Sequence, residues 1–244
     1  MIPIASARMY SWSPTLTAAW RRLLEWVVAH SGGEVKVLEL ADPYPLEELW
    51  ARDDLGCVFM CGYPWAMHAE RPHLLAVPVP APPRYRDRPI YFTDFVVRAD
   101  SPYRTLEDTF GGCIAYSIEH SHSGYNAARF HLLSYRRPDR PTLYSKVLGP
   151  LHRQLPVIDA VLDGRADVGP VDAYGLDLLR RHGAERAKRV QLVERRGQLR
   201  GPVGGQQRLG ELLIARFTDA DPDAFDVMLA RHRQAEAAAY TRLG

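Results

Sequence analysis

The sequence predicts an α/β fold of two lobes, each a mostly parallel sheet flanked by helices, with a ligand cleft between the lobes. Three observations predict it. Residues 1–60 alternate strand and helix patterns in the order β-α-β-α-β, which is typical of parallel sheets. A proline-rich stretch at 78–89 separates this part from a second one, which begins with an apolar strand pattern at 90–97. A chain of 244 residues is long enough for two lobes of about 100 residues each.

The first strand and helix are clearly marked. A short apolar segment at 2–5 predicts a strand. Ser13 followed by Pro14 is typical of a helix start, because Ser caps free N–H groups and Pro needs no hydrogen bond at the first position. Apolar residues at helical spacing then continue toward Gly32, which can end the helix. Alternating apolar residues at 35–40 predict the second strand.

The rest of this half supplies the first candidate site residues. A short helix is predicted at 45–52, and the continuous apolar run at 55–60 is typical of a buried parallel strand. Ligands of parallel α/β sheets bind beyond the carboxyl ends of the strands. The strand ends carry the candidates Arg8, Met9, Tyr10, Gly62 and Tyr63. Arg8 also fits a solvated loop arginine, and Tyr63 also fits a core aromatic residue.

The second half repeats the alternation of strands and helices. After the strand at 90–97, the pattern predicts these elements in order: a short helix at 106–110, a strand at 113–116, a helix that ends at Gly164, a strand at 166–171 and a helix capped by Asp172. Residues 190–193 would lead back to the first lobe, which a strand at 212–215 and a helix from 221 would complete.

The lobe boundaries follow from this order. We assign residues 1–86 and 190–244 to lobe I and residues 87–189 to lobe II. The loops at the strand ends of both lobes would then surround one cleft, and hinge closure around a ligand is the usual mechanism of such an architecture. The Gly- and Gln-rich stretch at 195–210 is predicted to have little regular structure.

A serine-rich turn at 117–126 is the strongest candidate for a binding site. It joins the strand at 113–116 to a segment with helical spacing, and Ser121 and Ser123 are candidate N-caps. A helix start offers free N–H groups and the positive end of the helix dipole, and Gly124 lets a ligand approach the backbone. The turn can therefore hold an anion. The alternative is an ordinary capped helix, with the flanking His120 and His122 on the surface.

Bulk properties exclude several classes of function. The net charge of +2 gives no electrostatic case for nucleic acid, and no apolar run reaches the roughly 18 residues of a membrane span. Cys57, Cys61 and Cys113 cannot all pair, and no second group of Cys or His completes a zinc site, so neither a disulfide framework nor a metal is expected. Cys61 fits a small packing residue better than a nucleophile.

Taken together, these motifs resemble those of the phosphate/phosphonate-binding family of ABC-transporter solute-binding proteins, which have the type II periplasmic-binding-protein fold. The resemblance covers about residues 1–195. It rests on the order of five features: Met9-Tyr10, Cys61-Gly62-Tyr63-Pro64, Ser121-x-Ser123-Gly124-Tyr125-Asn126, His152 before a helix, and Gly164-Arg165-Ala166-Asp167-Val168 followed by Asp172.

The resemblance implies a non-catalytic protein that captures a small phosphate- or phosphonate-like anion in the cleft, for transport with an ABC permease and without a cofactor. Its implied ligand-binding residues are Arg8, Tyr10, Gly62, Tyr63, Ser121, Ser123, Gly124, Tyr125, His152 and Asp172. The serine turn would hold the oxyanion, and Asp172 would accept from a hydroxyl or amine of the ligand. Gln154 and Leu155 stand where relatives often carry another serine, which leaves open a different ligand.

Two other functions fit the same fold. A cytoplasmic enzyme acting on a small carboxylate or phosphorylated metabolite would need a general acid or base, for which Asp172, His152 and Glu119 are candidates. A ligand sensor would need only the site and a partner protein. The start of the sequence lacks the pattern of a signal peptide, which favours the cytoplasm, whereas the resemblance favours the periplasm. Asp172 and His152 also fit a plain helix cap and a supporting histidine.

Overall fold

The structure is a computed structural model that describes residues 1–40, 45–196 and 210–243. Contacts between Cα atoms divide the chain into two units, Met1–Cys61 and Gly62–Gly244. The predicted lobe boundaries at 86/87 and 189/190 stay a prediction. Of the stretch at 195–210 that is predicted to lack regular structure, residues 197–209 lie outside the described residues.

The first unit is a small parallel sheet, as predicted. Strand β1 (Ile4–Ser6) lies between β2 (Lys36–Val37) and β3 (Leu55–Val58), and both pairings are parallel. Helix α1 (Pro14–Ser31) connects β1 to β2, and α2 (Leu46–Trp50) precedes β3.

Helix α1 begins and ends where the sequence predicts. The Ser13 hydroxyl accepts a hydrogen bond from the Leu16 N–H, and Gly32 ends the helix with φ of 73°. Leu16, Trp20 and Leu24 form its buried face, which anchors the helix through apolar contacts. A short 3-10 helix, Arg8–Tyr10, follows β1.

The described residues of the second unit form three sheets. Strand β5 (Thr93–Arg98) lies between β8 (Gly169–Asp172) and β9 (Val190–Arg196). Strand β6 (Cys113–Ala115) pairs in parallel with β7 (Lys146–Leu148), and β4 (Val77–Pro80) pairs antiparallel with β10 (Ile214–Thr218).

The pairing around β5 differs from the expected parallel arrangement. Both β8 and β9 run antiparallel to β5, whereas β1–β3 and β6–β7 are parallel. An apolar run shows that a strand is buried on both faces, but it does not encode the direction of the neighbouring strands. The sequence therefore predicts the strands here better than their directions.

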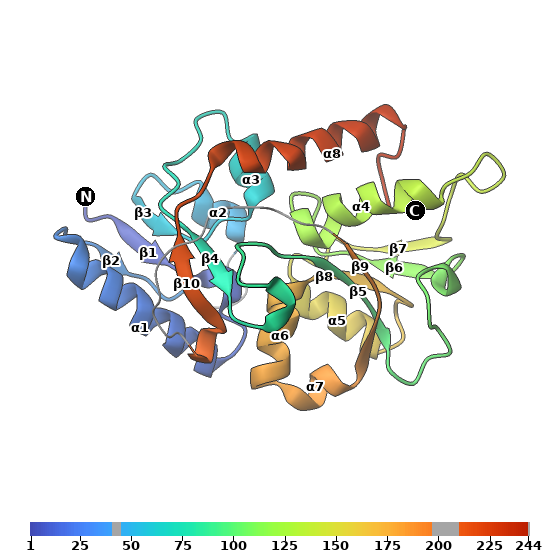
Figure 1. The fold of residues 1–244 in the computed structure, drawn as a ribbon, viewed down its shortest axis with the longest axis horizontal. Helices are drawn as coiled ribbons and strands as arrows, with labels where there is room; N and C mark the ends of the chain where they lie inside the picture. Colours follow the sequence, from blue (N-terminus) through green and yellow to red (C-terminus); the bar gives the residue numbers. More distant parts are fainter. Residues whose placement is uncertain (41–44, 197–209, 244) are drawn as a thin grey trace. The chain divides into compact units, whose positions relative to one another are not determined.

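The helices of the second unit cover its sheets. They are α3 (Gly62–Met67), α4 (Ala127–Leu132), α5 (Gln154–Leu162), α6 (Ala173–His182), α7 (Ala184–Lys188) and α8 (Asp226–Ala237). Short 3-10 helices lie at Pro83–Tyr85, Glu107–Thr109, Leu133–Tyr135, Gly210–Leu212 and Pro222–Phe225. The helix predicted at 106–110 is one of these 3-10 turns. Helix α8 packs against both α3 and α4 (Figure 1).

The two faces of β5 belong to two different apolar cores. Phe95 and Val97 pack in the core that also holds α4, whereas Val96 packs in the core that holds α5 and α6. Alternate residues of a strand point to opposite faces, which explains this division. The central strand is thus covered on both sides, and its two ends are the places where polar side chains can gather.

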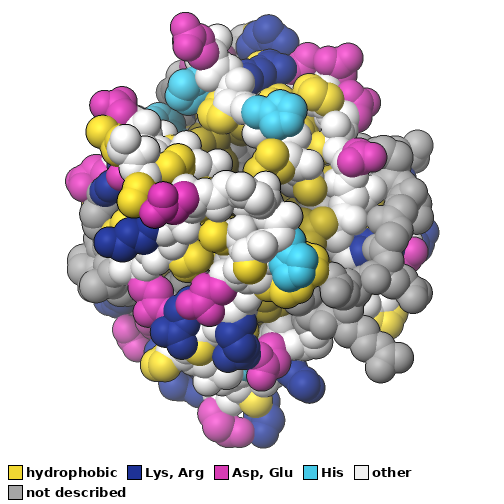
Figure 2. Space-filling view, turned by 90° about the vertical axis from the view of Figure 1, so that its left-hand side faces the viewer, with side chains coloured by type: hydrophobic (Ala, Val, Ile, Leu, Met, Phe, Trp, Pro, Cys, Tyr) yellow, Lys and Arg dark blue, Asp and Glu magenta, His cyan; other side chains and the backbone are white. Residues whose placement is uncertain are grey.

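The described surface carries both signs of charge. On the face shown in Figure 2, Lys and Arg side chains are interspersed with Asp and Glu among the described residues, with hydrophobic atoms between them. This mixture agrees with the small net charge of +2. None of the described helices is long and apolar enough to cross a membrane.

Candidate functional site

The serine turn forms a π-helix rather than the start of a regular α-helix. Residues His122–Asn126 make the π-helical turn, and α4 continues from it. Ser121 is its N-cap: the Ser121 hydroxyl accepts from the Gly124 N–H at 2.9 Å, and the Asn126 N–H donates to the Ser121 carbonyl at 3.0 Å. Single π-helical turns occur frequently at functional sites. Ser121 therefore caps a helical turn, as predicted, but the turn is a π-helix rather than the expected α-helix.

Three polar side chains converge on the bare face of Gly124. A Cβ atom at this position would lie 2.1 Å from Ser117 Oγ, 2.8 Å from Gln154 Nε2 and 3.0 Å from Ser121 Oγ. Any side chain at position 124 would collide with these atoms, so the close approach requires glycine. We call Ser117, Ser121, Gly124 and Gln154 the Gly124 site. Its residues come from the end of β6, the π-helical turn and the first residue of α5.

Ser117 is the most informative member of the Gly124 site. Its side chain is 2% exposed, and its hydroxyl has no hydrogen-bond partner among the described residues. Its carbonyl accepts from the His152 N–H at 2.7 Å, which fixes the backbone on both sides of the site. A buried polar group without a partner costs about 1–3 kcal/mol, so native proteins rarely keep one without a reason. A bound ligand is one such reason.

Asp172 borders the site at the end of β8. One carboxylate oxygen accepts from the Gly175 N–H at 2.8 Å and caps α6, while the other lies 3.4 Å from the Ser123 hydroxyl, which donates to it. The Asp172 N–H donates to Gln154 Oε1 at 3.2 Å. Burial raises the pKa of Asp172 to about 6, and the charge of Asp94 adds to this rise.

His122 differs from its predicted place on the surface. The side chain is 4% exposed, and its ring lies 6.1 Å from the ring of Tyr91. Burial lowers the pKa of His122 to about 3, and the charge of Arg231 adds to the effect, so the imidazole is neutral at pH 7. The sequence does not reveal this burial because Tyr91 and Arg231 come from distant parts of the chain.

Tyr125, another predicted ligand residue, directs its side chain into the core. Its ring packs against Tyr116 at 5.0 Å between centroids, and its hydroxyl donates to the Thr241 carbonyl at 3.1 Å. Tyr125 can therefore offer a ligand only its backbone. His152 is exposed and has φ of 63°, and Glu119 is exposed and accepts from the Tyr116 hydroxyl at 2.5 Å.

The four predicted ligand residues nearest the start of the chain pack within their own units. They are Arg8, Tyr10, Gly62 and Tyr63. A Cβ atom at Gly62 would lie 2.7 Å from Met228 Cε, so this glycine lets α3 approach α8. Tyr63 is 4% exposed and packs against the ring of His232 at 5.4 Å. In the first unit, Tyr10 stacks on Trp20 at 6.2 Å, and Arg8 is buried. Their predicted role in ligand binding stays a prediction.

The structure adds two residues to the predicted site, Ser117 and Gln154. Ser117 is the first residue of the serine-rich stretch and follows the predicted strand directly, which is a usable signal. The signal for Gln154 is its place where relatives often carry another serine, but the sequence does not show that the amide reaches Gly124.

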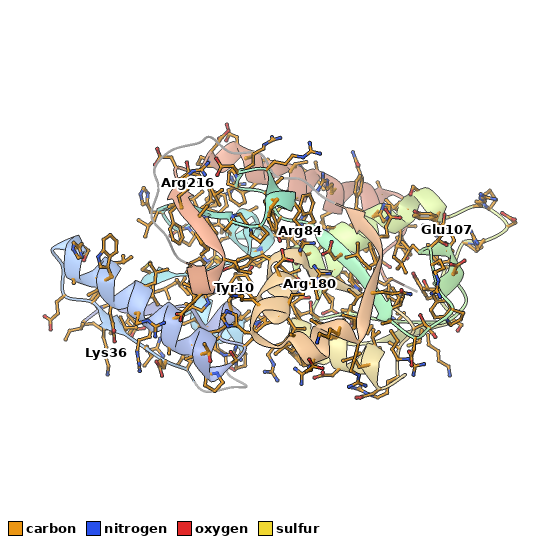
Figure 3. All side chains as sticks on the ribbon, turned by 60° about the horizontal axis from the view of Figure 1, so that its bottom comes forward. Tyr10, Lys36, Arg84, Glu107, Arg180 and Arg216 are labelled. Atoms are coloured by element: carbon orange, nitrogen blue, oxygen red, sulfur yellow. The ribbon has the colours of Figure 1, made fainter. Side chains whose placement is uncertain are left out.

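A second buried polar cluster surrounds Asp94 on β5. Arg84, which is labelled in Figure 3, donates to Asp94 and to Asp177 at 2.7 Å each, and to the Ala173 carbonyl. The Tyr85 hydroxyl donates to Asp177 at 2.8 Å. We call Arg84, Tyr85, Asp94 and Asp177 the Arg84 cluster. It ties the 3-10 helix Pro83–Tyr85 to β5 and α6.

Comparison with known families identifies the class of protein. Residues 10–220 match the family described as the periplasmic substrate-binding proteins of ABC phosphonate transporters. The chain belongs to this family, which confirms the resemblance noted in the sequence. Membership implies a solute-binding role in transport, with a small ligand and an ABC permease as partners. No curated protein sequence matches the chain.

Several solved structures share the fold of this chain. The binding protein of an ABC phosphonate transporter from Pseudomonas aeruginosa has a TM-score of 0.76 at 15% identity, over 98% of this chain and 87% of that one. A Prochlorococcus marinus protein in complex with methylphosphonate has a TM-score of 0.63 at 12% identity, over 97% and 83%. A Xanthomonas citri protein bound to ATP has a TM-score of 0.60 at 16% identity, over 98% of both chains. The fold is therefore that of type II periplasmic binding proteins, as predicted.

Proposed function

We propose that this protein is a non-catalytic solute-binding protein that captures a small phosphate- or phosphonate-like oxyanion at the Gly124 site, for ABC-type transport. The observation that carries the proposal is the buried Ser117 hydroxyl, which has no partner among the described residues and is directed at Gly124. An oxyanion that accepts this hydroxyl would satisfy it.

The chemistry around Gly124 suits an anion. Ser117, Ser121 and Gln154 can each donate a hydrogen bond, because the Ser121 oxygen accepts from Gly124 while its proton stays available. The first N–H groups of a helical turn and its dipole add to this donor set. All these donors are neutral, so binding would rest on hydrogen bonds and dipoles rather than on an ion pair.

Asp172 would serve the part of the ligand that carries a donor. Its second oxygen lies 3.4 Å from the Ser123 hydroxyl, a long hydrogen bond, and can also accept from a hydroxyl or amine. The neighbours with the same fold agree with this class of ligand: one is a component of an ABC phosphonate transporter, and another is in complex with methylphosphonate.

Thermal shift and calorimetry against a small panel test the proposal: phosphate, phosphite, methylphosphonate, aminoethylphosphonate, sulfate, acetate and ATP. A ligand at 100 times its Kd stabilises the folded state by about 2.7 kcal/mol, which raises the Tm by roughly 5–10 °C. Ser117→Ala should lower the affinity for the best ligand roughly 10- to 100-fold, the effect of one hydrogen bond to a charged group.

The matched control is Ser134→Ala, because the Ser134 hydroxyl bonds the His131 carbonyl within its own helical segment. This variant should bind as the unmodified protein does. If no oxyanion of the panel binds, or if Ser117→Ala binds with unchanged affinity, the proposed site is wrong.

One observation favours a second candidate, a sensor or enzyme for a phosphorylated metabolite. The Xanthomonas citri protein of the same fold is bound to ATP. In an enzyme, Asp172 and the Ser123 hydroxyl would form the acid–base pair, since the pKa of Asp172 is raised to about 6. Mass spectrometry of the bound ligand after long incubation separates the two: a binding protein returns the ligand unchanged, whereas an enzyme releases a product.

A further inference from the structure

Another polar cluster joins α4, α8 and the π-helical turn around the guanidinium of Arg129. Arg129 is 2% exposed, and each of its two terminal nitrogens donates to two acceptors. Nη1 donates to Glu236 and to the Thr241 carbonyl, and Nη2 donates to His232 Nδ1 at 2.7 Å and to Asn126 Oδ1 at 3.4 Å. We call Asn126, Arg129, His232 and Glu236 the Arg129 cluster.

The bond from Arg129 fixes where the imidazole of His232 carries its proton. An arginine N–H can only donate, so the bond at 2.7 Å requires an unprotonated Nδ1 and places the proton of the neutral ring on Nε2. Asn126 Oδ1 lies 3.3 Å from the same Nδ1, and these two acceptors share Arg129 Nη2. A proton on Nδ1 would therefore remove the bond from Arg129 and place two cations side by side.

Asn126 connects the Arg129 cluster to the backbone of the serine-rich turn at 117–126. Its Nδ2 donates to the Glu119 carbonyl at 2.7 Å and to the Ser121 carbonyl at 3.1 Å. Both amide protons are used in this way, so the Asn126 oxygen must face Arg129. A chain of hydrogen bonds thus runs from His232 on α8 through Arg129 and Asn126 to the turn.

The surroundings of His232 oppose its protonation on balance. Burial lowers the pKa of His232, and the positive charge of Arg129 on α4 adds to this effect. On α8 itself, the charge of Glu236 raises the pKa of His232 and the charge of Arg233 lowers it. Tyr63 on α3, whose ring lies 5.4 Å away, stays uncharged because burial raises the pKa of its hydroxyl. The neutral imidazole is therefore the form that fits the folded cluster.

We propose that His232 is a pH-sensitive contact between α8 and α4, which forms while the ring is neutral and breaks when the ring takes up a proton. The neutral ring accepts from Arg129 and keeps α8 attached to α4, whereas the imidazolium loses this bond and repels the guanidinium. Because Asn126 shares the same donor, α8 and the serine-rich turn should loosen together. The inference concerns the second unit alone and does not rest on the proposed function.

The direction of the pH dependence follows from the lowered pKa of His232. The opened or unfolded chain binds the proton more tightly than the folded cluster does. The contribution of His232 to stability is therefore present above its ordinary value of 6.5 and is lost as the pH falls below it. Asp172 also titrates in this range, so the test must compare proteins that all retain Asp172.

Hydrogen exchange of the intact chain between pH 7.5 and pH 5, measured by mass spectrometry and corrected for the intrinsic effect of pH on exchange, tests the proposal. In the unmodified protein, peptides from α8 and from residues 117–126 should lose protection by a factor of roughly three or more as the pH falls. In His232→Asn, the amide oxygen can still accept from Arg129 but takes up no proton, so protection should stay constant. His73→Asn, at an exposed position, is the matched control and should behave as the unmodified protein does.

Two outcomes would overturn the inference. The first is an equal response of α8 to pH in the unmodified protein and in His232→Asn. The second comes from nitrogen-15 shifts of the His232 ring in the unmodified protein: a proton on Nδ1 at pH 7.5, or titration at or above the ordinary value of 6.5. This second measurement decides if His232→Asn does not fold. Neither measurement involves a ligand, so failure of the anion panel leaves the His232 contact untouched.

Discussion

The Arg84 cluster and the Gly124 site are both buried and polar, yet they differ in how their groups are paired. In the Arg84 cluster, both carboxylates and the tyrosine hydroxyl have partners, and the distances are 2.7–2.8 Å. In the Gly124 site, Ser117 has no partner among the described residues, and the Gln154 NH₂ group makes no bond to them. The groups of the first arrangement are paired with one another, whereas the second leaves donors without a partner among the described residues.

The two groups of residues should therefore respond differently to substitution. Removing a group from the complete cluster should cost stability, because the charges left behind stay buried. Removing a group from the Gly124 site should cost binding and little stability. The expected effects on the free energy of unfolding therefore decrease from Arg84 to Ser117.

Arg84→Ala should have the largest effect on stability. It removes the guanidinium from Asp94, which is 0% exposed, and leaves Asp177 only the more exposed Arg180, and such losses cost about 3–5 kcal/mol. Urea denaturation followed by circular dichroism measures the change. Arg180→Ala is the control, because Arg180 also pairs with Asp177 but is 43% exposed, and its loss should cost under about 1 kcal/mol. Equal losses in the two variants would show that the burial of the Arg84 ion pairs adds nothing to their effect on stability.

Asp172 should give the next largest effect, and it depends on pH. Its folded-state pKa of about 6 lies above the ordinary value of 3.8, so the folded state binds the proton more tightly than the unfolded state. The resulting stabilisation is present below about pH 4 and is lost as the pH rises through 6. Asp172→Asn stays neutral and can still cap α6.

The stability of the unmodified protein relative to Asp172→Asn should therefore fall by up to about 2–3 kcal/mol between pH 4 and pH 7. Urea denaturation across this range measures the difference. The exposed Asp139, replaced by Asn, is the control and should show a much smaller trend. A difference that is constant with pH would show that burial does not hold the proton on Asp172.

Ser121 should show an intermediate effect, because it caps the π-helical turn and also belongs to the Gly124 site. Ser121→Ala removes the bond from the Gly124 N–H and should cost about 1 kcal/mol of stability together with affinity. Ser121→Asp should restore the cap, yet its charge should abolish anion binding. An aspartate variant that binds the anion as well as the unmodified protein does would place the ligand away from Ser121.

Ser117→Ala should cause no loss of stability in the ligand-free protein and should raise it by up to about 1–3 kcal/mol, since it removes a buried hydroxyl that has no partner among the described residues. The same variant carries the expected loss of affinity, so denaturation and calorimetry on one sample test the contrast. A stability loss comparable to that of Ser121→Ala would indicate that the Ser117 hydroxyl has a structural partner after all.

Much of the fold is predictable because local patterns determine it. The cap at Ser13, the helix end at Gly32 and the cap at Asp172 all follow from side chains that bond their own backbone. Local signals do not fix strand direction, which is why the antiparallel partners of β5 were not predicted. The same limit applies to the burial of His122, which depends on Tyr91 and Arg231.

The site is predictable only in part, for a related reason. Ser121 and Gly124 are visible as a cap and a glycine within one turn, and the order of motifs points to the family. The convergence of Ser117 and Gln154 on Gly124 arises from the packing of β6, the π-helical turn and α5. A single sequence shows which side chains can donate, but not which of them meet.

The bond between the Tyr125 hydroxyl and the Thr241 carbonyl joins residues 116 positions apart. Arg129 donates to the same carbonyl across 112 positions, and Tyr240 and Leu243 are buried in the core that holds α4. Contacts of such sequence separation form only after a long loop has closed, and closing that loop costs entropy first. The contacts that hold α4 against the core therefore depend on the docking of the last residues of the chain.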